Sequence, residues 1–208
     1  MRRTSLKFDE LNSLSRDYYE DYFGEITALD ADQKTDRVLI AMALEDRFLN
    51  VLSMIEVRKN RGEQFFGDSI DWFTMAFLAV AVRRVDDQTI HDAASRFGID
   101  VALSTYKNQD NDYMLSADRA INMAATESNA IMCYGELADA VKAGKSMKKW
   151  VTIMDGRERE WHGEADGMLV PIDQPFEVGG ELLMYPLDTS LGATADNIAN
   201  CRCVAEYI

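Results

Sequence analysis

The sequence predicts an α+β fold, in which a helical N-terminal body is followed by a small C-terminal β-rich module. Apolar residues recur every three to four positions over 8–22 and 38–55, which is the period of a helix. Proline disrupts helix interiors, so its absence before residue 145 permits long helices there. All the prolines and a glycine pair lie later in the chain, at Pro171, Pro175, Pro186 and Gly179–Gly180. We therefore expect the body over 1–145 and the module over 146–208.

Three further helices are expected in the body. Residues 72–82 are apolar nearly all round, which predicts a helix buried on most sides. The aromatic residues around it would anchor a neighbouring subunit only if they remained exposed. Asp86 or Asp87 can cap the next helix, and Gly98 would end it. A long helix is expected over 112–143, with Gly144 as its C-terminal stop.

Turn and strand signals dominate the C-terminal module. Residues 150–154 have the composition of a short strand, and residues 201–208 that of a terminal strand. Gly179–Gly180 separates the apolar runs 175–178 and 182–185, as a two-residue hairpin turn does.

Charge and composition restrict the function. The chain of 208 residues carries a net charge of -14, which argues against a general nucleic-acid binder, although a local basic strip runs from Lys142 to Arg159. Residues 72–82 form the longest apolar stretch, too short for a bilayer, and no apolar run follows the basic Arg2 and Arg3, so we expect neither a membrane span nor a signal peptide. An odd count of three cysteines without an export signal predicts reduced thiols.

A set of polar and aromatic residues beginning at Lys148 has a distinctive spacing. The segment follows the pattern K-x-W-x-T-x-x-D-x-R-x-R-x-x-H, at Lys148, Trp150, Thr152, Asp155, Arg157, Arg159 and His162. An Asp166-Gly167 turn follows, and N-C-R-C stands at residues 200–203. Upstream, R-x-I-x-x-x-x-T-E occupies residues 119–127. Together, in this order and at these separations, the motifs resemble the phage head-morphogenesis family, also called Mu F-like minor capsid proteins.

The resemblance covers about residues 115–208, so its motif begins in the last helix of the body. It implies a non-enzymatic component of the phage head, made in the bacterial host cytoplasm and present in few copies at the portal vertex. The implied role is head morphogenesis and DNA packaging or ejection through structural contacts. The implied partners are the portal protein and the major capsid protein, with packaged DNA as a further candidate.

The charged residues of the motif suggest a structural network. Asp155 at a strand end can accept hydrogen bonds from turn amides, and Arg157 and Arg159 each present a planar fork of donors to carboxylates. We expect Glu127, on the preceding helix, to pair with one of these arginines or with Arg202 and so to clamp the helix to the module. The alternative is that Glu127 is an exposed residue on a solvated face.

His162, Cys201 and Cys203 are residue types that bind zinc, but structural zinc sites normally have four ligands. Asp155 or Asp166 would have to supply the fourth. The alternative is that His162 forms local hydrogen bonds while the cysteines pack as small apolar residues. Ligand counting favours this alternative, so the sequence predicts no cofactor and leaves zinc as the second interpretation.

The resemblance gives a reason for the incomplete ligand set. Other members of the family have a C-x-x-C near residues 159–162 and a histidine shortly before the N-C-R-C. In this sequence Arg159 and His162 occupy the C-x-x-C positions, and Ile198 stands where the late histidine would be.

Two rival functions belong to other classes. A DNA-contacting packaging factor would use the strip from Lys142 to Arg159, and its DNA binding would fall steeply with salt. A hydrolase would use Cys201 activated by His162. The sequence contains no P-loop, dinucleotide-binding or nucleophile-elbow motif, and we therefore predict that the chain is not an enzyme.

Overall fold

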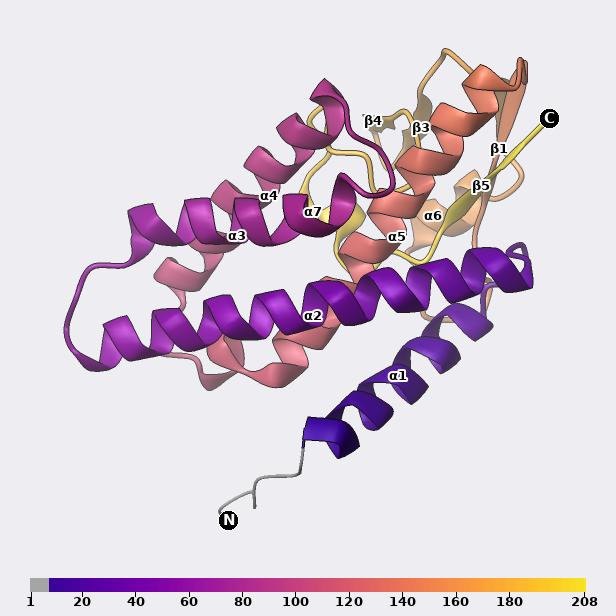
Figure 1. The fold of residues 1–208 in the computed structure, drawn as a ribbon. Helices are drawn as coiled ribbons and strands as arrows, with labels where there is room; N and C mark the ends of the chain where they lie inside the picture. The colour runs from indigo at the N-terminus through magenta and orange to yellow at the C-terminus, as the bar shows by residue number, and fades with distance from the viewer. Residues whose placement is uncertain (1–7) are drawn as a thin grey trace.

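Long helices form the N-terminal part of the chain and short strands the C-terminal part, which confirms the predicted α+β class (Figure 1). The computed structural model describes residues 8–208, with side chains from residue 15 onward; Arg2 and Arg3 therefore lie outside the described residues. The helices of the body are α1 (Phe8–Gly24), α2 (Ala31–Asn60), α3 (Phe66–Ala81), α4 (Gln88–Lys107) and α5 (Ala117–Lys142), with a short 3-10 turn, η1 (Asp112–Leu115), before α5. Among the described residues, no helix combines the length and apolar character needed to cross a membrane.

Side-chain caps set where the helices begin. The carboxylate of Asp30 accepts a hydrogen bond from the backbone N–H of Gln33. The Asp30 N–H in turn donates to Oε1 of the Gln33 side chain, so a capping box starts α2. Asp87 accepts from the Ile90 N–H at the start of α4, which confirms it as the predicted cap. Ser116 caps α5, so the long helix begins five residues later than predicted and η1 precedes it.

Gly98 lies inside α4 and does not end it, contrary to prediction. An added Cβ there would lie 2.1 Å from Oγ1 of Thr74 and 2.7 Å from the carbonyl oxygen of Ile70, both on α3. The glycine is needed because the backbones of α3 and α4 approach closely at this point. A glycine that ends a helix and a glycine at a close contact between two helices look the same in the sequence, because both positions require the absence of a side chain.

Gly98→Ala is expected to destabilise the fold by about 1–2 kcal/mol, because the new methyl group must push α3 and α4 apart. Gly67→Ala is the matched control, since an added Cβ at this position in α3 has no neighbour within 4 Å. The control is expected to be neutral or stabilising, because alanine favours the helix over glycine. Urea unfolding of both variants measures the difference, and equal stabilities would contradict the close approach.

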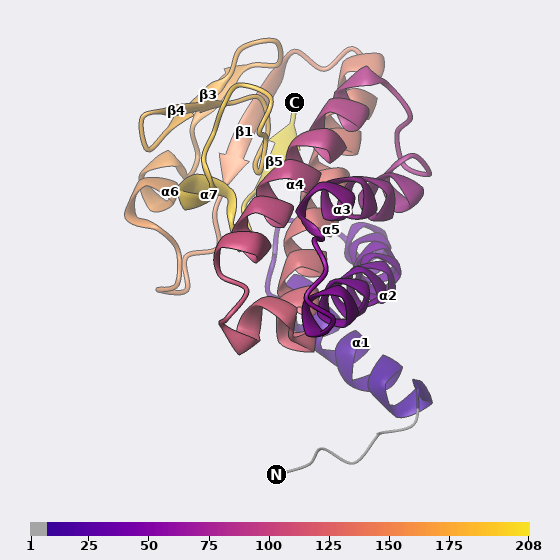
Figure 2. The same cartoon turned by 90° about the vertical axis from the view of Figure 1, so that its left-hand side faces the viewer.

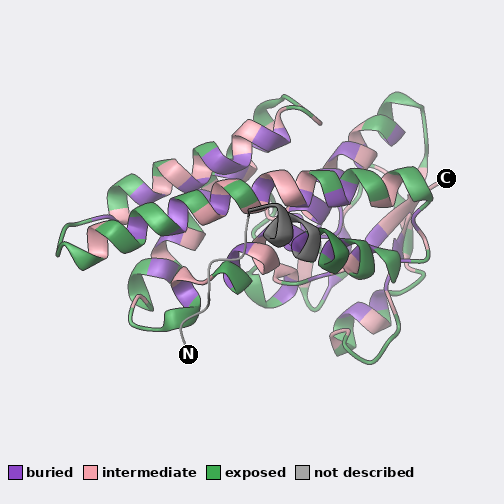
Figure 3. Ribbon diagram, turned by 60° about the horizontal axis from the view of Figure 1, so that its bottom comes forward, coloured by how far each residue is buried: buried purple, intermediate pink, exposed green. Residues whose placement is uncertain are grey.

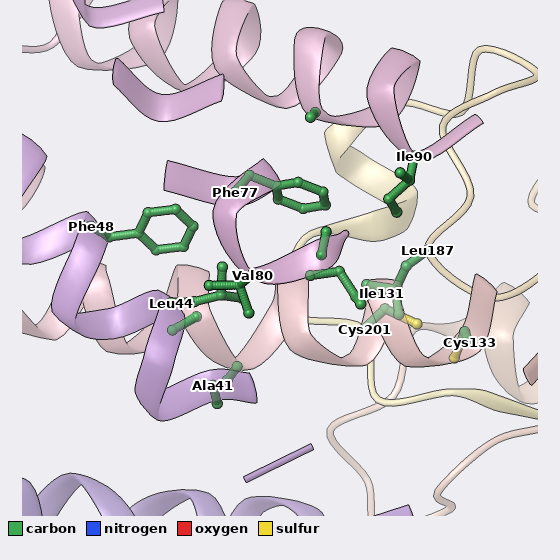
Figure 4. Packing of buried hydrophobic residues seen from close by; sticks show 14 of the residues in the cluster. Ala41, Leu44, Phe48, Phe77, Val80, Ile90, Ile131, Cys133, Leu187 and Cys201 are labelled. Atoms are coloured by element: carbon green, nitrogen blue, oxygen red, sulfur yellow. The ribbon is translucent and has the colours of Figure 1, made fainter. Parts of the chain in front are cut away.

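The core runs along the inward faces of all five helices and continues into the module (Figure 3). Figure 4 shows side chains of α2, α3, α4 and α5 packed together, among them Phe48, Phe77 and Ile131. Of the aromatic residues in and before the apolar stretch 72–82, Phe73 and Phe77 are buried in this core and contact Phe97 of α4. Phe65 is buried as well, whereas Phe66 and Trp72 are partly buried, so these aromatic residues serve mainly to pack the protein's own core.

A buried ion pair joins α2 to α5. Arg37 is fully buried, and its guanidinium donates to both carboxylate oxygens of Glu136, at 2.8 and 2.9 Å. The Nε of Arg37 also donates to Oδ1 of Asn129, at 2.8 Å. Each of the three guanidinium nitrogens of Arg37 therefore donates to an acceptor, which is the condition under which a buried arginine is tolerated.

Two small antiparallel sheets form the C-terminal module. Strand β1 (Met147–Val151) lies between β2 (Leu169–Pro171) and β5 (Val204–Tyr207), and β3 (Phe176–Val178) pairs with β4 (Glu181–Leu183). Two short helices, α6 (Glu160–Ala165) and α7 (Ala195–Ile198), complete the module, which lies beside α4 and α5 (Figure 2). The predicted hairpin is confirmed, and Gly179 and Gly180 both have the positive φ that its turn requires.

Lys148 and Trp150 lie on the buried face of β1. Trp150 contacts the rings of Phe176 and His162 edge to face, at centroid distances of 5.3 and 5.8 Å. Lys148 is fully buried; its Nζ donates to the carbonyl of Met184 at 2.6 Å and lies over the Phe176 ring. Burial lowers the pKa of Lys148 to about 8. The predicted basic strip is therefore interrupted, because this lysine faces the interior.

Candidate functional site

A charge network connects the loop after β1 to the end of α1. The carboxylate of Asp155 accepts from Nε of Arg157 at 2.9 Å and from Nη2 of Arg202 at 2.8 Å. Arg202 also donates through Nη1 to Glu25, at 2.6 Å, and Arg157 reaches the same Glu25 oxygen. Glu25 directly follows α1, so four charged side chains tie the module to the first helix of the body.

The network is partly open to solvent, and Arg202 is its most buried member, with 11% of its side chain exposed. Hydrogen bonds from Arg157 and then Arg202 hold the pKa of Asp155 well below its usual range, against the opposing effect of burial. A depressed acid pKa means that the stabilisation is present above the pKa of the unfolded carboxyl and is lost as the pH falls. The network therefore weakens in acid.

Arg202→Met is expected to destabilise the fold by about 1–2 kcal/mol at neutral pH, because it removes three charge-assisted hydrogen bonds to Asp155 and Glu25. The loss should shrink as the pH falls below about 4, because the unfolded Asp155 carboxyl takes up a proton there while the arginines keep the folded one ionised, so the network contributes less to stability. Arg16→Met, which breaks the exposed pair with Glu20, is the control and should leave the stability nearly unchanged, because solvent screens that pair. Chemical unfolding at several pH values measures both; a loss that is independent of pH would contradict the role given to the network.

Two predicted members lie outside this network. Arg159 donates from Nη2 to the backbone carbonyl of Ala199 at 2.6 Å, and thus supports the loop before Cys201 instead of pairing with a carboxylate. Glu127 pairs with none of Arg157, Arg159 or Arg202, so the predicted clamp is wrong. The reason is geometric: Glu127 faces a groove between α5 and its neighbours, while Arg157 and Arg202 are taken by Glu25 and Asp155.

The groove holding Glu127 has a volume of about 750 Å³ and lies between α4, α5 and the segment 185–200. Its lining is mainly apolar, with Phe97, Met123 and Ile198 among the residues that form it. Glu127 is half-buried, and no hydrogen bond or ion pair reaches its carboxyl from the described residues. Burial raises the pKa of Glu127 to about 8.

A second cluster lies inside the module, where His162, Cys201 and Cys203 meet. All three are almost fully buried. Nδ1 of the imidazole lies 3.6 Å from the sulfur of Cys201 and 3.4 Å from that of Cys203, and the three potential ligand atoms lie within 4.8 Å of one another. Asp155 and Asp166 do not join them: Asp155 binds the arginines, and Asp166 accepts from the Thr152 N–H at 2.8 Å.

Local backbone structure brings these side chains together. Asn200 adopts a positive φ of 56° two residues after the end of α7, and this turn directs the chain through Cys201 into β5. His162 comes from α6, where Oγ1 of Thr152 donates to its carbonyl at 2.7 Å. The same hydroxyl lies 3.5 Å from the sulfur of Cys203.

The two thiols of the cluster interact strongly. The hydrogen bond from the Cys201 thiol lowers the pKa of Cys203 to about 5, although burial opposes this. The same contact, together with burial, raises the pKa of Cys201 well above its ordinary value. A cavity of about 30 Å³ adjoins the three residues, and a space of this size holds about one water molecule.

Two residues that position these sites were missed in the sequence. Glu25 carries no signal of its own, because it is one acidic residue among many and its partners are far along the chain. Asn197, whose Oδ1 lies 2.6 Å from Nε2 of His162, stands in a four-residue helix without a motif.

Comparison with known proteins identifies the class to which this fold and these motifs belong. The family described as Phage Mu protein F like protein matches residues 88–206, from the start of α4 to the last strand. The match covers more than half of the chain, so the chain belongs to this family, and it is a virion component of the minor head protein type.

One relative is the Minor head protein GP7 of Bacillus phage SPP1, which is 30% identical over 98 residues. The matched stretch covers 45% of this chain but 31% of the phage SPP1 protein, so the chain spans less than a third of that relative's length. No solved structure matches the chain significantly.

Proposed function

We propose that this chain acts at the portal vertex of a phage head, where it contacts the portal and major capsid proteins and supports head assembly and DNA packaging or ejection. The observation that carries the proposal is the family match over residues 88–206, which includes the whole set of motifs around the charge network. The relative from phage SPP1 is itself a minor head protein.

The geometry of the chain supports an adhesive role. The core is continuous from the helices into the module, and the Glu25 network adds a second connection between the two. Body and module therefore form one stiff unit, which suits a protein that works by holding other subunits in place.

The groove at Glu127 is the surface we assign to a partner. Its apolar lining fits an apolar segment of another head protein, and the Glu127 carboxyl, which has no partner among the described residues, fits a lysine or arginine on that segment. A cation placed there would allow Glu127 to ionise, since burial alone now raises its pKa to about 8. The occupant we propose is thus an apolar segment with one basic side chain.

Neither rival function gains support from the site. The DNA-contacting strip from Lys142 to Arg159 loses Lys148 to the interior, and Arg157 is paired with carboxylates. The hydrolase would need Cys201 and His162 to meet a substrate, yet both are buried beside a cavity of about 30 Å³. We propose that the family's structural role holds for this chain.

The test is the composition of purified heads. Heads assembled with this chain are separated on a gradient from free protein and quantified by mass spectrometry against the portal and major capsid proteins. We expect the chain in heads, in few copies, and cross-linked to the portal protein. Chain that stays free while complete heads form would overturn the proposal, and so would cross-links to the major capsid protein spread evenly over the shell.

A further inference from the structure

We propose that His162, Cys201 and Cys203 bind one zinc ion, through Nδ1 of the imidazole and the two sulfur atoms. Zinc binding at this site does not depend on the role proposed for the chain in the phage head. The three ligand atoms lie within 4.8 Å of one another, and the nitrogen lies 3.4 and 3.6 Å from the sulfurs. Tetrahedral bonds of about 2.0–2.3 Å to nitrogen and sulfur place ligand atoms at roughly these separations.

Asn197 selects the histidine tautomer that a metal needs. The side-chain amide of Asn197 donates from Nδ2 to the carbonyl of Val178 at 2.8 Å, which leaves its Oδ1 as the atom facing His162. That oxygen lies 2.6 Å from Nε2 and must accept a hydrogen bond, so Nε2 carries the proton. Nδ1 then keeps its lone pair and points between the two sulfurs. Metal-binding histidines are usually oriented by a partner of this kind on the other ring nitrogen.

The two cysteines match the charge of the ion. Both are free thiols, and on binding each would release its proton to solvent and supply one negative charge, so the buried ion and its ligands would be neutral together. Two thiolates with an imidazole favour zinc over the harder cations, which prefer oxygen ligands. The adjoining cavity of about 30 Å³ can hold a water molecule as the fourth ligand.

Binding would join two separate segments of the module. His162 belongs to α6, while Cys201 and Cys203 belong to the loop between α7 and β5. This loop also carries Arg202, which holds Asp155 and Glu25, so the metal would fix the base of the charge network. The expected consequence is a large gain in thermal stability, detectable without any assay of phage assembly.

The first experiment is metal analysis of the whole chain, purified under reducing conditions without a histidine tag. We expect about one zinc ion per chain, and removal by a strong chelator should lower the Tm by roughly 8 °C or more, since a ligand at a thousand times its Kd has an effect of this size. Cobalt added to the chelated protein should produce the absorption bands of thiolate ligands. Protein that stays metal-free after incubation with zinc, with all thiols reduced, would overturn the proposal.

Variants separate this site from incidental binding. Cys201→Ser, Cys203→Ser and His162→Gln should each lose the ion or bind it at least tenfold more weakly. Cys133→Ala is the matched control: Cys133 is also a buried free thiol, but it lies outside the cluster and should leave metal content unchanged. Cobalt spectra of the unmutated protein keep the test valid if a variant does not fold. Zinc retained at full stoichiometry in the Cys201 and Cys203 variants would contradict the assignment.

Discussion

Arg37→Met is expected to destabilise the protein by about 3–5 kcal/mol, the largest effect of any single substitution considered. The variant leaves Glu136, whose side chain is 11% exposed, without its charged partner and with only the neutral Gln33 amide donating to it, and it leaves Oδ1 of Asn129 without the donated Nε–H. Removing one member of a buried pair costs this much because the remaining charge is neither hydrated nor neutralised. Denaturant unfolding at neutral pH measures the loss.

The double variant Arg37→Met with Glu136→Gln tests the cause. If the cost comes from the unpaired charge, neutralising Glu136 should recover about half of the lost stability. Lys149→Met is the control for losing a positive charge at the surface, because Lys149 forms only a partly exposed pair with Glu206, and it should cost less than about 0.5 kcal/mol. A double variant as unstable as Arg37→Met would show that lost packing dominates.

Arg37 illustrates what sequence patterns cannot provide. It lies on α2, where the helical spacing of apolar residues and the Asp30 capping box are both local features of the chain. Its side chain is buried only because α5, which begins 80 residues later, packs against α2 so that Glu136 and Asn129 lie opposite Arg37. Nothing near Arg37 distinguishes it from an exposed arginine on the same helix.

The candidate sites divide in the same way. The turn at Asp155 and the hairpin at Gly179–Gly180 could be predicted, because each is determined by a few adjacent residues. The partners of Arg202 could be predicted only in part: Asp155 belongs to the same motif, whereas Glu25 reaches it through the docking of α1. The assignment of Glu127 to Arg157 or Arg202 failed because Glu25 and Asp155 already accept the hydrogen bonds of those arginines.

Glu127→Gln is expected to stabilise the isolated chain by about 2–3 kcal/mol near pH 8. Burial raises the pKa of Glu127 in the folded protein to about 8, while the unfolded carboxyl ionises near its model value of 4.5. An acid with a raised pKa in the folded state loses stability as the pH rises between these two values. The full pKa difference between the folded and unfolded states would correspond to a larger gain in stability. We expect the smaller value because the half-buried carboxyl keeps some contact with water.

Glu127→Gln is expected to raise the stability of the isolated chain but to weaken its binding to a partner. Well below pH 4.5 the variant and the unmutated protein should be equally stable, because both side chains are then neutral in the folded and the unfolded state. Binding to purified portal protein should weaken in Glu127→Gln by roughly tenfold, since the partner's basic side chain loses its carboxylate. Thermal unfolding across pH and binding assays therefore separate two roles: a purely structural Glu127 would change stability and leave binding intact. Unchanged binding would also result if the groove held a small molecule. That result would show that the groove is not the docking surface for the portal protein, while the pH-dependent gain in stability would remain.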